Sequence, residues 1–296
     1  MHEKTKNEQP EQEPQAPKHD ARKFMIAIQR TPDFLANMPS TSYRDMQPEE
    51  KMRSFREAIG TTALSLADRI KEKPGGEHNL NANLLTLIGT LNDYDANIKI
   101  VNEIKRRNQD IKRISPEDRA SMKEAKRPLI RFNHALREVI NSGASQFSFD
   151  ELLHFITDAH EIGGENGSRK GKEAFSTELR TKIVGMRNEI AFEQLLIHGG
   201  IPYELGSEED DAAGKDFRVR DIGIDTKASE STTRAAKKQA LRRGKNPDHI
   251  IWSHINEEDF EGGLALPNHK IAAIWEKLKP DIIQALFPNR KAAQTA

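Results

Sequence analysis

The chain has 296 residues, enough for one large or two modest domains, and its 46 Lys and Arg residues balance its 46 Asp and Glu residues. Zero net charge gives no argument for a nucleic-acid partner, so any such argument must come from local patches. The sequence contains no Cys, which excludes disulfides and cysteine nucleophiles, and no apolar stretch approaches the roughly 20 residues that span a bilayer, so we expect a cytoplasmic protein with no membrane partner.

The N-terminal half has a helical pattern. Residues 1–22 are rich in Glu, Gln, Lys and Pro, which predicts a disordered tail, and residues 23–162 predict an all-α domain for target recognition or dimerisation. Helix starts are indicated at Pro48, at Ser115-Pro116 and at a capping box from Ser148 to Glu151.

One helix of this region carries a heptad-like seam. Its apolar residues alternate spacings of four and three: Leu80, Leu84, Leu87, Leu91, Tyr94, Ile98 and Val101. We interpret the seam as part of an intramolecular bundle, and a coiled-coil homodimer through the N-terminal helices is the alternative.

The pattern changes after a Gly-rich basic stretch at 163–174, which predicts a linker. Residues 175–296 then show a helix to about 198, three short β-like runs, a basic helix, an apolar strand and a final amphipathic helix. This order predicts a small mixed α/β domain after the helical one, so the expected fold class of the whole chain is α+β.

Charged residues recur in the β-like runs "DFRVR" and "IGIDTKA". Asp225 and Lys227 are two residues apart and share one face of their strand. If the two runs form a hairpin around Arg220–Gly223, Asp216 lies at the same end. Two carboxylates there raise each other's pKa unless a divalent cation binds, and Mg²⁺, with Mn²⁺ as a substitute, prefers such oxygen ligands. Lys227 could then stabilise developing charge or position a water.

Glu189 is a further candidate ligand. It follows Met186 by three residues, so it lies at the edge of the buried stripe of its helix and could reach the same edge of the sheet. Gly185, one turn earlier, is expected to let the helix approach the sheet closely.

Gly185-x-x-x-Glu189, then Asp216, then Ile224-Asp225-Thr226-Lys227 resemble the PD-(D/E)XK nuclease superfamily, the restriction-endonuclease-like fold. The family's core order of helix, three strands, helix and strand is similar to the order that we read over residues 175–255. The resemblance implies that Glu189, Asp216 and Asp225 bind the metal and that Lys227 is the catalytic lysine. It says nothing about the helical half, and Lys215 stands where the family has a proline. The alternative is a surface ion pair of Asp225 and Lys227 on an edge strand.

The predicted helix after the motif is basic on one face. Between Ser231 and Asn246 the sequence has no acid and six basic residues: Arg234, Lys237, Lys238, Arg242, Arg243 and Lys245. Four of them follow helical spacing, which is typical of a surface that binds phosphates.

These features favour a Mg²⁺-dependent nuclease, and specifically an endonuclease of restriction or defence type that acts on duplex DNA. The alternative is a non-catalytic nucleic-acid-binding or helical scaffold protein. The enzyme hypothesis requires Glu189, Asp216, Asp225 and Lys227 to converge.

Overall fold

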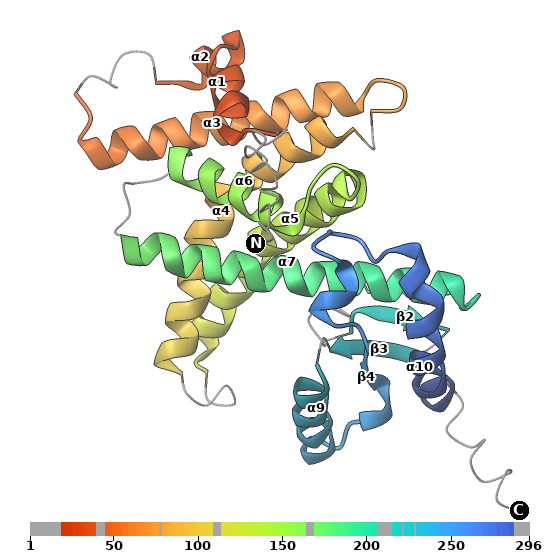
Figure 1. The fold of residues 1–296 in the computed structure, drawn as a ribbon. Coiled ribbons are helices and arrows are strands. Elements are labelled where there is room, and N and C mark those ends of the chain that lie inside the picture. Colours follow the sequence, from red (N-terminus) through yellow and green to blue (C-terminus); the bar gives the residue numbers. More distant parts are fainter. Residues whose placement is uncertain are drawn as a thin grey trace, which may run out of the picture.

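The computed structural model describes residues 19–39, 45–76, 79–108, 114–163, 169–206, 215–220, 222–227 and 229–286. Helices make up most of it, and a small four-stranded mixed sheet lies toward the C-terminal end, so the predicted α+β class is confirmed (Figure 1). Within these ranges, no helix combines the length and the apolar character needed to cross a membrane.

The N-terminal helices begin where the capping signals indicate. They are α1 (Ala21–Gln29), α2 (Pro32–Asn37), α3 (Pro48–Lys71), α4 (Leu80–Arg107), α5 (Pro116–Gly143) and α6 (Phe149–Gly163). Ser115 accepts a hydrogen bond from the Asp118 N–H at 3.0 Å. Ser148 and Glu151 exchange the two hydrogen bonds of a capping box, at 2.7 and 3.2 Å. The predicted tail lies outside the described residues as far as position 18, but Ala21 is buried and opens α1.

The heptad-like seam is buried within the chain. All seven of its residues are buried on α4, which packs against α3 and α5. The Gly60 and Gly89 positions let α3 and α4 approach closely, because a Cβ at Gly89 would lie 2.5 Å from Leu64 Cγ and 3.1 Å from the Gly60 carbonyl oxygen. The intramolecular bundle that we inferred from the sequence therefore accounts for the seam, and a homodimer through the outer surfaces of these helices stays a prediction.

The long helix α7 (Arg169–His198) belongs to two hydrophobic cores. Phe175, Leu179, Ile183 and Ile190 pack in the helical core, whereas Ala191, Phe192, Leu195 and Leu196 pack in the core of the sheet. The predicted linker at 163–174 is thus helical from Arg169, with 164–168 outside the described residues, and the change of core falls inside α7. Burial of Phe175 and Leu179 favours helix there over the loop preference of the Gly-containing sequence.

The C-terminal elements follow the predicted order. After α7 come β1 (Glu204–Leu205), β2 (Phe217–Val219), β3 (Ile222–Lys227), α9 (Glu230–Arg242), η2 (Pro247–His249), β4 (Ile250–Trp252), η3 (Glu257–Phe260) and α10 (Asn268–Leu286). The sheet order is β1-β2-β3-β4; the first three strands are antiparallel neighbours, and β4 runs parallel to β3 after the α9 crossover. The hairpin predicted around Arg220–Gly223 is confirmed, with Val219 opposite Ile222.

A buried arginine links α7 to both parts of the molecule. Arg187 has 0% exposed side chain, and its guanidinium lies 4.6 Å from the ring centre of Phe149 on α6 and 4.0 Å from that of Phe260 on η3. It donates a hydrogen bond to the Gly263 carbonyl at 3.0 Å and contacts the Glu257 carboxylate. One side chain therefore joins α6, α7 and the segment after β4.

Candidate active site at the end of strand β3

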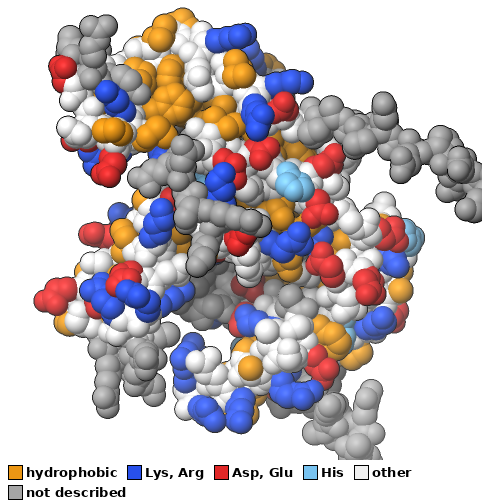
Figure 2. Space-filling model, turned by 60° about the vertical axis from the view of Figure 1, so that its left-hand side comes forward, with side chains coloured by type: hydrophobic (Ala, Val, Ile, Leu, Met, Phe, Trp, Pro, Cys, Tyr) orange, Lys and Arg blue, Asp and Glu red, His pale blue; other side chains and the backbone are white. Residues whose placement is uncertain are grey.

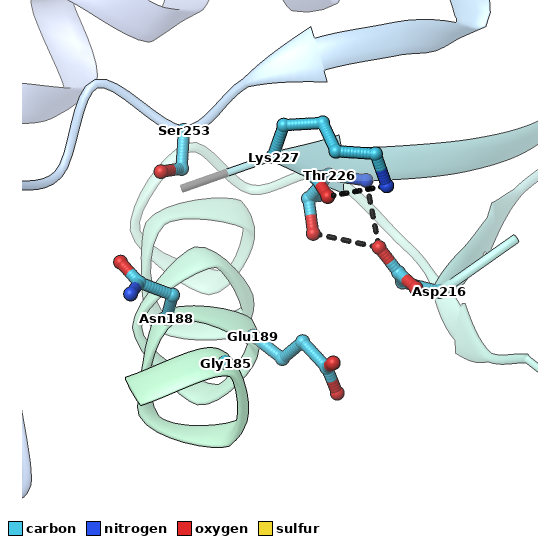
Figure 3. A pocket seen from close by; sticks show the side chains of 7 residues that line it. All are labelled: Gly185, Asn188, Glu189, Asp216, Thr226, Lys227 and Ser253. Atoms are coloured by element: carbon cyan, nitrogen blue, oxygen red, sulfur yellow. Dashed lines mark hydrogen bonds between the residues drawn. The ribbon is translucent and has the colours of Figure 1, made fainter. Parts of the chain in front are cut away.

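A small pocket lies where α7 passes the ends of β3 and β4. Its volume is about 140 Å³, and it is lined by Gly185, Asn188, Glu189, Asp216, Thr226, Lys227 and Ser253. In the view of Figure 3 the charged ends of Lys227, Asp216 and Glu189 lie along one side of the pocket, and the polar groups of Asn188 and Ser253 lie along the other. Three of the four residues predicted from the motif thus share one pocket.

Asp216 is held in place by the neighbouring strand. Its backbone N–H donates to the Ile224 carbonyl at 2.8 Å, which continues the β2–β3 ladder by one residue. Its Oδ2 accepts hydrogen bonds from the N–H and the hydroxyl of Thr226, at 2.7 and 2.8 Å. Because both bonds go to one oxygen, the carboxylate is oriented while Oδ1 is left without a hydrogen-bond partner among the described residues.

Asp225 and Lys227 contact each other, as their spacing on β3 predicts. The Lys227 ammonium donates to Asp225 Oδ1 and also to the Thr226 carbonyl at 3.2 Å. Burial raises the pKa of the Asp225 carboxyl above its usual range; Lys227 opposes this rise and the carboxylate of Asp216 adds to it. A partly desolvated acid, a second acid and a lysine therefore interact electrostatically at this end of the sheet.

Asp225 is the predicted site residue that does not line the pocket. Side chains alternate along a strand, so Asp225 lies on the face opposite to Ile224 and Thr226, and Ile224 is in the core that α7 covers. Its partner across the parallel β3–β4 pair is Ile250. The predicted convergence of four residues is therefore incomplete: Asp225 and Lys227 share one face of β3, but only Lys227, at the end of the strand, lines the pocket.

Glu189 lines the pocket from α7, and a residue of the helical half approaches it. Arg137 of α5 lies 3.8 Å from the Glu189 carboxylate and also contacts Glu193, one turn later. Gly185 serves a different purpose from the one expected, because a Cβ there would meet nothing within 4 Å. The close approach of α7 to the sheet does not depend on this glycine, which leaves open space at the pocket.

The pocket holds the kind of oxygen ligands that bind Mg²⁺. Mg²⁺ keeps several waters and is held by one or two carboxylates. Glu189 and Asp216 supply two, and the pocket volume leaves room for waters beside an ion. The donor set fits a hydrated Mg²⁺ or Mn²⁺ in its chemistry. A group of three or more acids or histidines arranged for a metal does not occur among the described residues.

The predicted basic helix is α9. Its cations are exposed except Lys237, which is half-buried on the side of Thr233 and Ala240. Arg234 pairs at 2.8 Å with Glu230, an acid that directly precedes the acid-free stretch from Ser231 to Asn246. Lys245, just beyond the helix, lies close enough to lower the pKa of Asp225. The end of α9 is therefore near the candidate site.

Four residues near the site were not identified as site residues from the sequence. Asn188, Thr226 and Ser253 line the pocket, and Arg137 approaches Glu189. Thr226 lies inside the motif, on the strand face opposite to Asp225 and Lys227, so strand alternation could have pointed to it. Asn188, Ser253 and Arg137 have no local signal in the sequence. A scan against protein-family models and searches of curated proteins and of solved structures found no match.

Proposed function

We propose that this chain is a Mg²⁺-dependent nuclease that hydrolyses phosphodiester bonds, acting as an endonuclease on duplex DNA. The observation that carries the proposal is the pocket in which Glu189, Asp216 and Lys227 meet. These residues come from the helix and strands that the resemblance to the PD-(D/E)XK superfamily assigns to them. A role in restriction or defence follows from analogy with that family alone.

The side chains of the pocket have distinct roles in this proposal. Thr226 fixes the Asp216 carboxylate through two hydrogen bonds, so the acid needs little reorganisation during the reaction. The Lys227 ammonium stabilises the negative charge that develops on the phosphoryl oxygens. Glu189 accepts a hydrogen bond from the attacking water and orients it. The chemistry that Mg²⁺ supplies when bound is Lewis-acid polarisation of a phosphoryl oxygen.

Asp225 acts on this site through Lys227. Its raised pKa reflects burial, and the ion pair with Lys227 compensates for part of that cost. The pair holds the lysine ammonium at the end of β3, where the pocket opens. Asp225 is in this respect a positioning residue, although the family resemblance also gives it a metal-binding role.

A second candidate function is non-catalytic binding of nucleic acid. The observation that favours it is that Asp225 pairs with Lys227 and the described residues form no three-acid metal group. A binding protein needs the basic surface of α9 but not the pocket acids. The two functions therefore differ in what happens when the pocket is changed.

The test is cleavage of supercoiled plasmid and of RNA by the purified chain, with Mg²⁺ or with a chelator. Lys227→Ala and Asp216→Asn are expected to lower the rate of DNA cleavage by about 100-fold or more, because each removes a charge that acts at the reacting phosphate. Both variants should bind DNA as the wild type does.

Lys99→Ala is the matched control. Lys99 is an exposed lysine that pairs with an aspartate, Asp95, at 2.8 Å on α4, so it reproduces the lost charge and the lost ion pair. Its cleavage rate should equal that of the wild type. Wild-type rates for Lys227→Ala, or cleavage that persists in the chelator, would refute the proposed enzyme and leave the binding function.

A further inference from the structure

The outer face of α5 is strongly basic. Five of its cations are exposed and have no ion-pair partner among the described residues: Arg119, Lys123, Lys126, Arg127 and Arg131. They lie opposite the buried side of the helix, which includes Ala125, Leu129 and Phe132. We call this set the α5 basic face. A solvated helix usually pairs such charges with acids three or four residues away.

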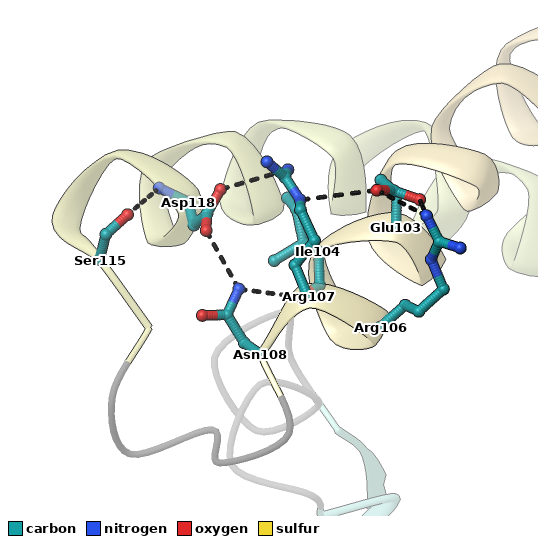
Figure 4. A network of polar contacts seen from close by, with 7 residues as sticks. All are labelled: Glu103, Ile104, Arg106, Arg107, Asn108, Ser115 and Asp118. Atoms are coloured by element: carbon teal, nitrogen blue, oxygen red, sulfur yellow. Dashed lines mark hydrogen bonds and ion pairs between the residues drawn. The ribbon is translucent and has the colours of Figure 1, made fainter.

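Two acids at the nearby end of the hairpin, Glu103 and Asp118, are neutralised by arginines of α4 (Figure 4). Glu103 pairs with Arg106 at 3.0 Å and with Arg107 at 3.7 Å, and Asp118 pairs with Arg107 at 3.4 Å. Asp118 also accepts a hydrogen bond from Asn108 at 3.0 Å. These contacts fasten the end of α4 to the start of α5. Glu103 and Asp118 therefore leave the α5 basic face unpaired; the exposed Glu124, three residues before Arg127, offsets one of its five positive charges.

The α5 basic face extends along α5 from the start of the helix toward the candidate active site. Arg137, which approaches the pocket residue Glu189, follows Lys126, Lys123 and Arg119 by 11, 14 and 18 residues. These intervals are close to three, four and five helical turns, so all four side chains lie on one side of α5. Burial lowers the pKa of Lys182 on α7, and the positive charge of Lys105, at the end of α4, lowers it further, so Lys105 lies near Lys182.

Cations thus lie on two sides of the pocket. On the other side is the exposed part of α9, whose end brings Lys245 near Asp225. In Figure 2, Lys and Arg side chains gather at the lower end of the molecule, where α9 lies, and on the lobe formed by the end of the α4–α5 hairpin; the surface is hollowed between them. Two basic walls with an acidic pocket between them suit a polyanion that is bound along its length and attacked at one point.

We propose that the α5 basic face is a second wall of the nucleic-acid site and binds backbone phosphates of the same duplex DNA that α9 binds. This inference rests on the proposed nuclease function and assigns a role to the helical half. From Arg119 to Arg137 the helix rises about 27 Å, at 1.5 Å per residue. That length matches about 8 base pairs of duplex at 3.4 Å each. Contacts to phosphates position the duplex and carry no sequence information.

Fluorescence anisotropy with a labelled duplex, measured in chelator across a salt series, tests the assignment. The α5 variant is Lys123→Gln with Lys126→Gln, and the α9 variant is Lys238→Gln with Arg242→Gln. Each should weaken binding about equally on two unrelated sequences. Each should also reduce the slope of log K against log salt by about 1.8, because each lost duplex contact contributes about 0.9.

Arg22→Gln with Lys23→Gln is the charge-matched control. Both residues are exposed on α1, far from α9 in Figure 1, and no described acid pairs with them. This variant should keep the affinity and the salt slope of the wild type. Arg127→Gln with Arg131→Gln repeats the test on the same face if the first α5 variant melts at a lower temperature than the wild type.

The outcomes separate the two proposals. Weakened binding by both the α5 and α9 variants, with an unchanged control, supports the second wall. An α5 variant that binds like the wild type while the α9 variant is weakened overturns it and leaves the nuclease proposal standing. Equal weakening by the α1 control means a general charge effect and also overturns it. No binding of duplex by the wild type overturns both.

Discussion

Arg187 offers a direct test of how the two cores are joined. Replacing it with Met keeps an unbranched apolar side chain between Phe149 and Phe260 but removes the charge. The two ring contacts contribute about 2 kcal/mol each when desolvated. Burying a guanidinium costs several kcal/mol, which offsets most of that gain. The remaining effects are the loss of the ion pair with Glu257, which is 61% exposed and so contributes little, and the loss of the donor at 3.0 Å to the Gly263 carbonyl.

An unsatisfied buried acceptor costs about 1–3 kcal/mol, and Gly263 is half-buried, so we expect Arg187→Met to lower the free energy of unfolding by about 2 kcal/mol when the lost ion pair is included. The loss should fall on the C-terminal core, because Phe260 and Gly263 belong to the segment after β4. With a denaturant slope of about 2 kcal/mol per molar urea, the midpoint of that core should move by about 1 M.

Two probes distinguish the cores in one urea titration. The only two tryptophans, Trp252 and Trp275, both lie in the C-terminal part, so their fluorescence reports its unfolding. Far-ultraviolet circular dichroism reports mainly the helical half. In Arg187→Met the fluorescence transition should move to lower urea and separate from the dichroism transition.

Arg180→Met is the matched control for this experiment. Arg180 is on the same helix and lies 5.0 Å from the same Phe149 ring, but its side chain is 54% exposed. Its loss should cost less than about 1 kcal/mol. Coincident transitions with an unshifted midpoint in Arg187→Met, or a more stable Met variant, would refute the reasoning.

Three further predictions concern the candidate site and its surroundings. A carboxyl with a raised pKa stabilises the fold below its ordinary pKa of about 4, and this contribution is lost as the pH rises through the raised value. Asp225→Asn should therefore melt at a higher temperature than the wild type at pH 7, and the difference should vanish near pH 3; a lower melting temperature at pH 7 contradicts this. Gly185→Ala should stabilise the protein by up to about 1 kcal/mol in urea, since its Cβ meets open space, whereas Gly89→Ala should destabilise it through its clash with Leu64; equal effects would count against this packing. Mg²⁺ should raise the melting temperature of the wild type but not that of Asp216→Asn, and equal shifts would mean that the ion binds elsewhere.

Much of the fold could be predicted because its signals are local. Capping residues mark where α3, α5 and α6 begin, and the seam on α4 consists of neighbours three and four residues apart. The hairpin of β2 and β3 is also local, so the meeting of Asp216 with the end of β3 followed from it. Local spacing does not say whether the seam packs against the same chain or against a second copy. The packing of α4 against α3 and α5 shows that the seam is buried within the chain.

The candidate site was predictable only in part, for a related reason. The direction of Lys227 and Asp225 follows from strand alternation, but which face α7 would cover depends on apolar residues far away in sequence. Arg137 and Glu189 are 52 residues apart and meet only because α5 and α7 pack together. The burial of Arg187 between two rings likewise depends on three separate elements.

The sharing of α7 between two cores has a consequence for synthesis on the ribosome. The helical core takes its last α7 residue at Ile190 but also needs Leu264 from the segment after β4, and the core of the sheet needs Ala285, which comes 95 residues after Ile190. At about 5–20 residues per second, this interval lasts roughly 5–19 seconds. Early in this interval, the end of α7 carries Phe192, Leu195 and Leu196 before the strand residues that cover them, such as Phe217, Ile224 and Ile251, have been made. The nascent chain therefore passes through a stage in which a helical half that still lacks Leu264 presents an apolar helix end, and a slower stretch of translation would prolong that exposure.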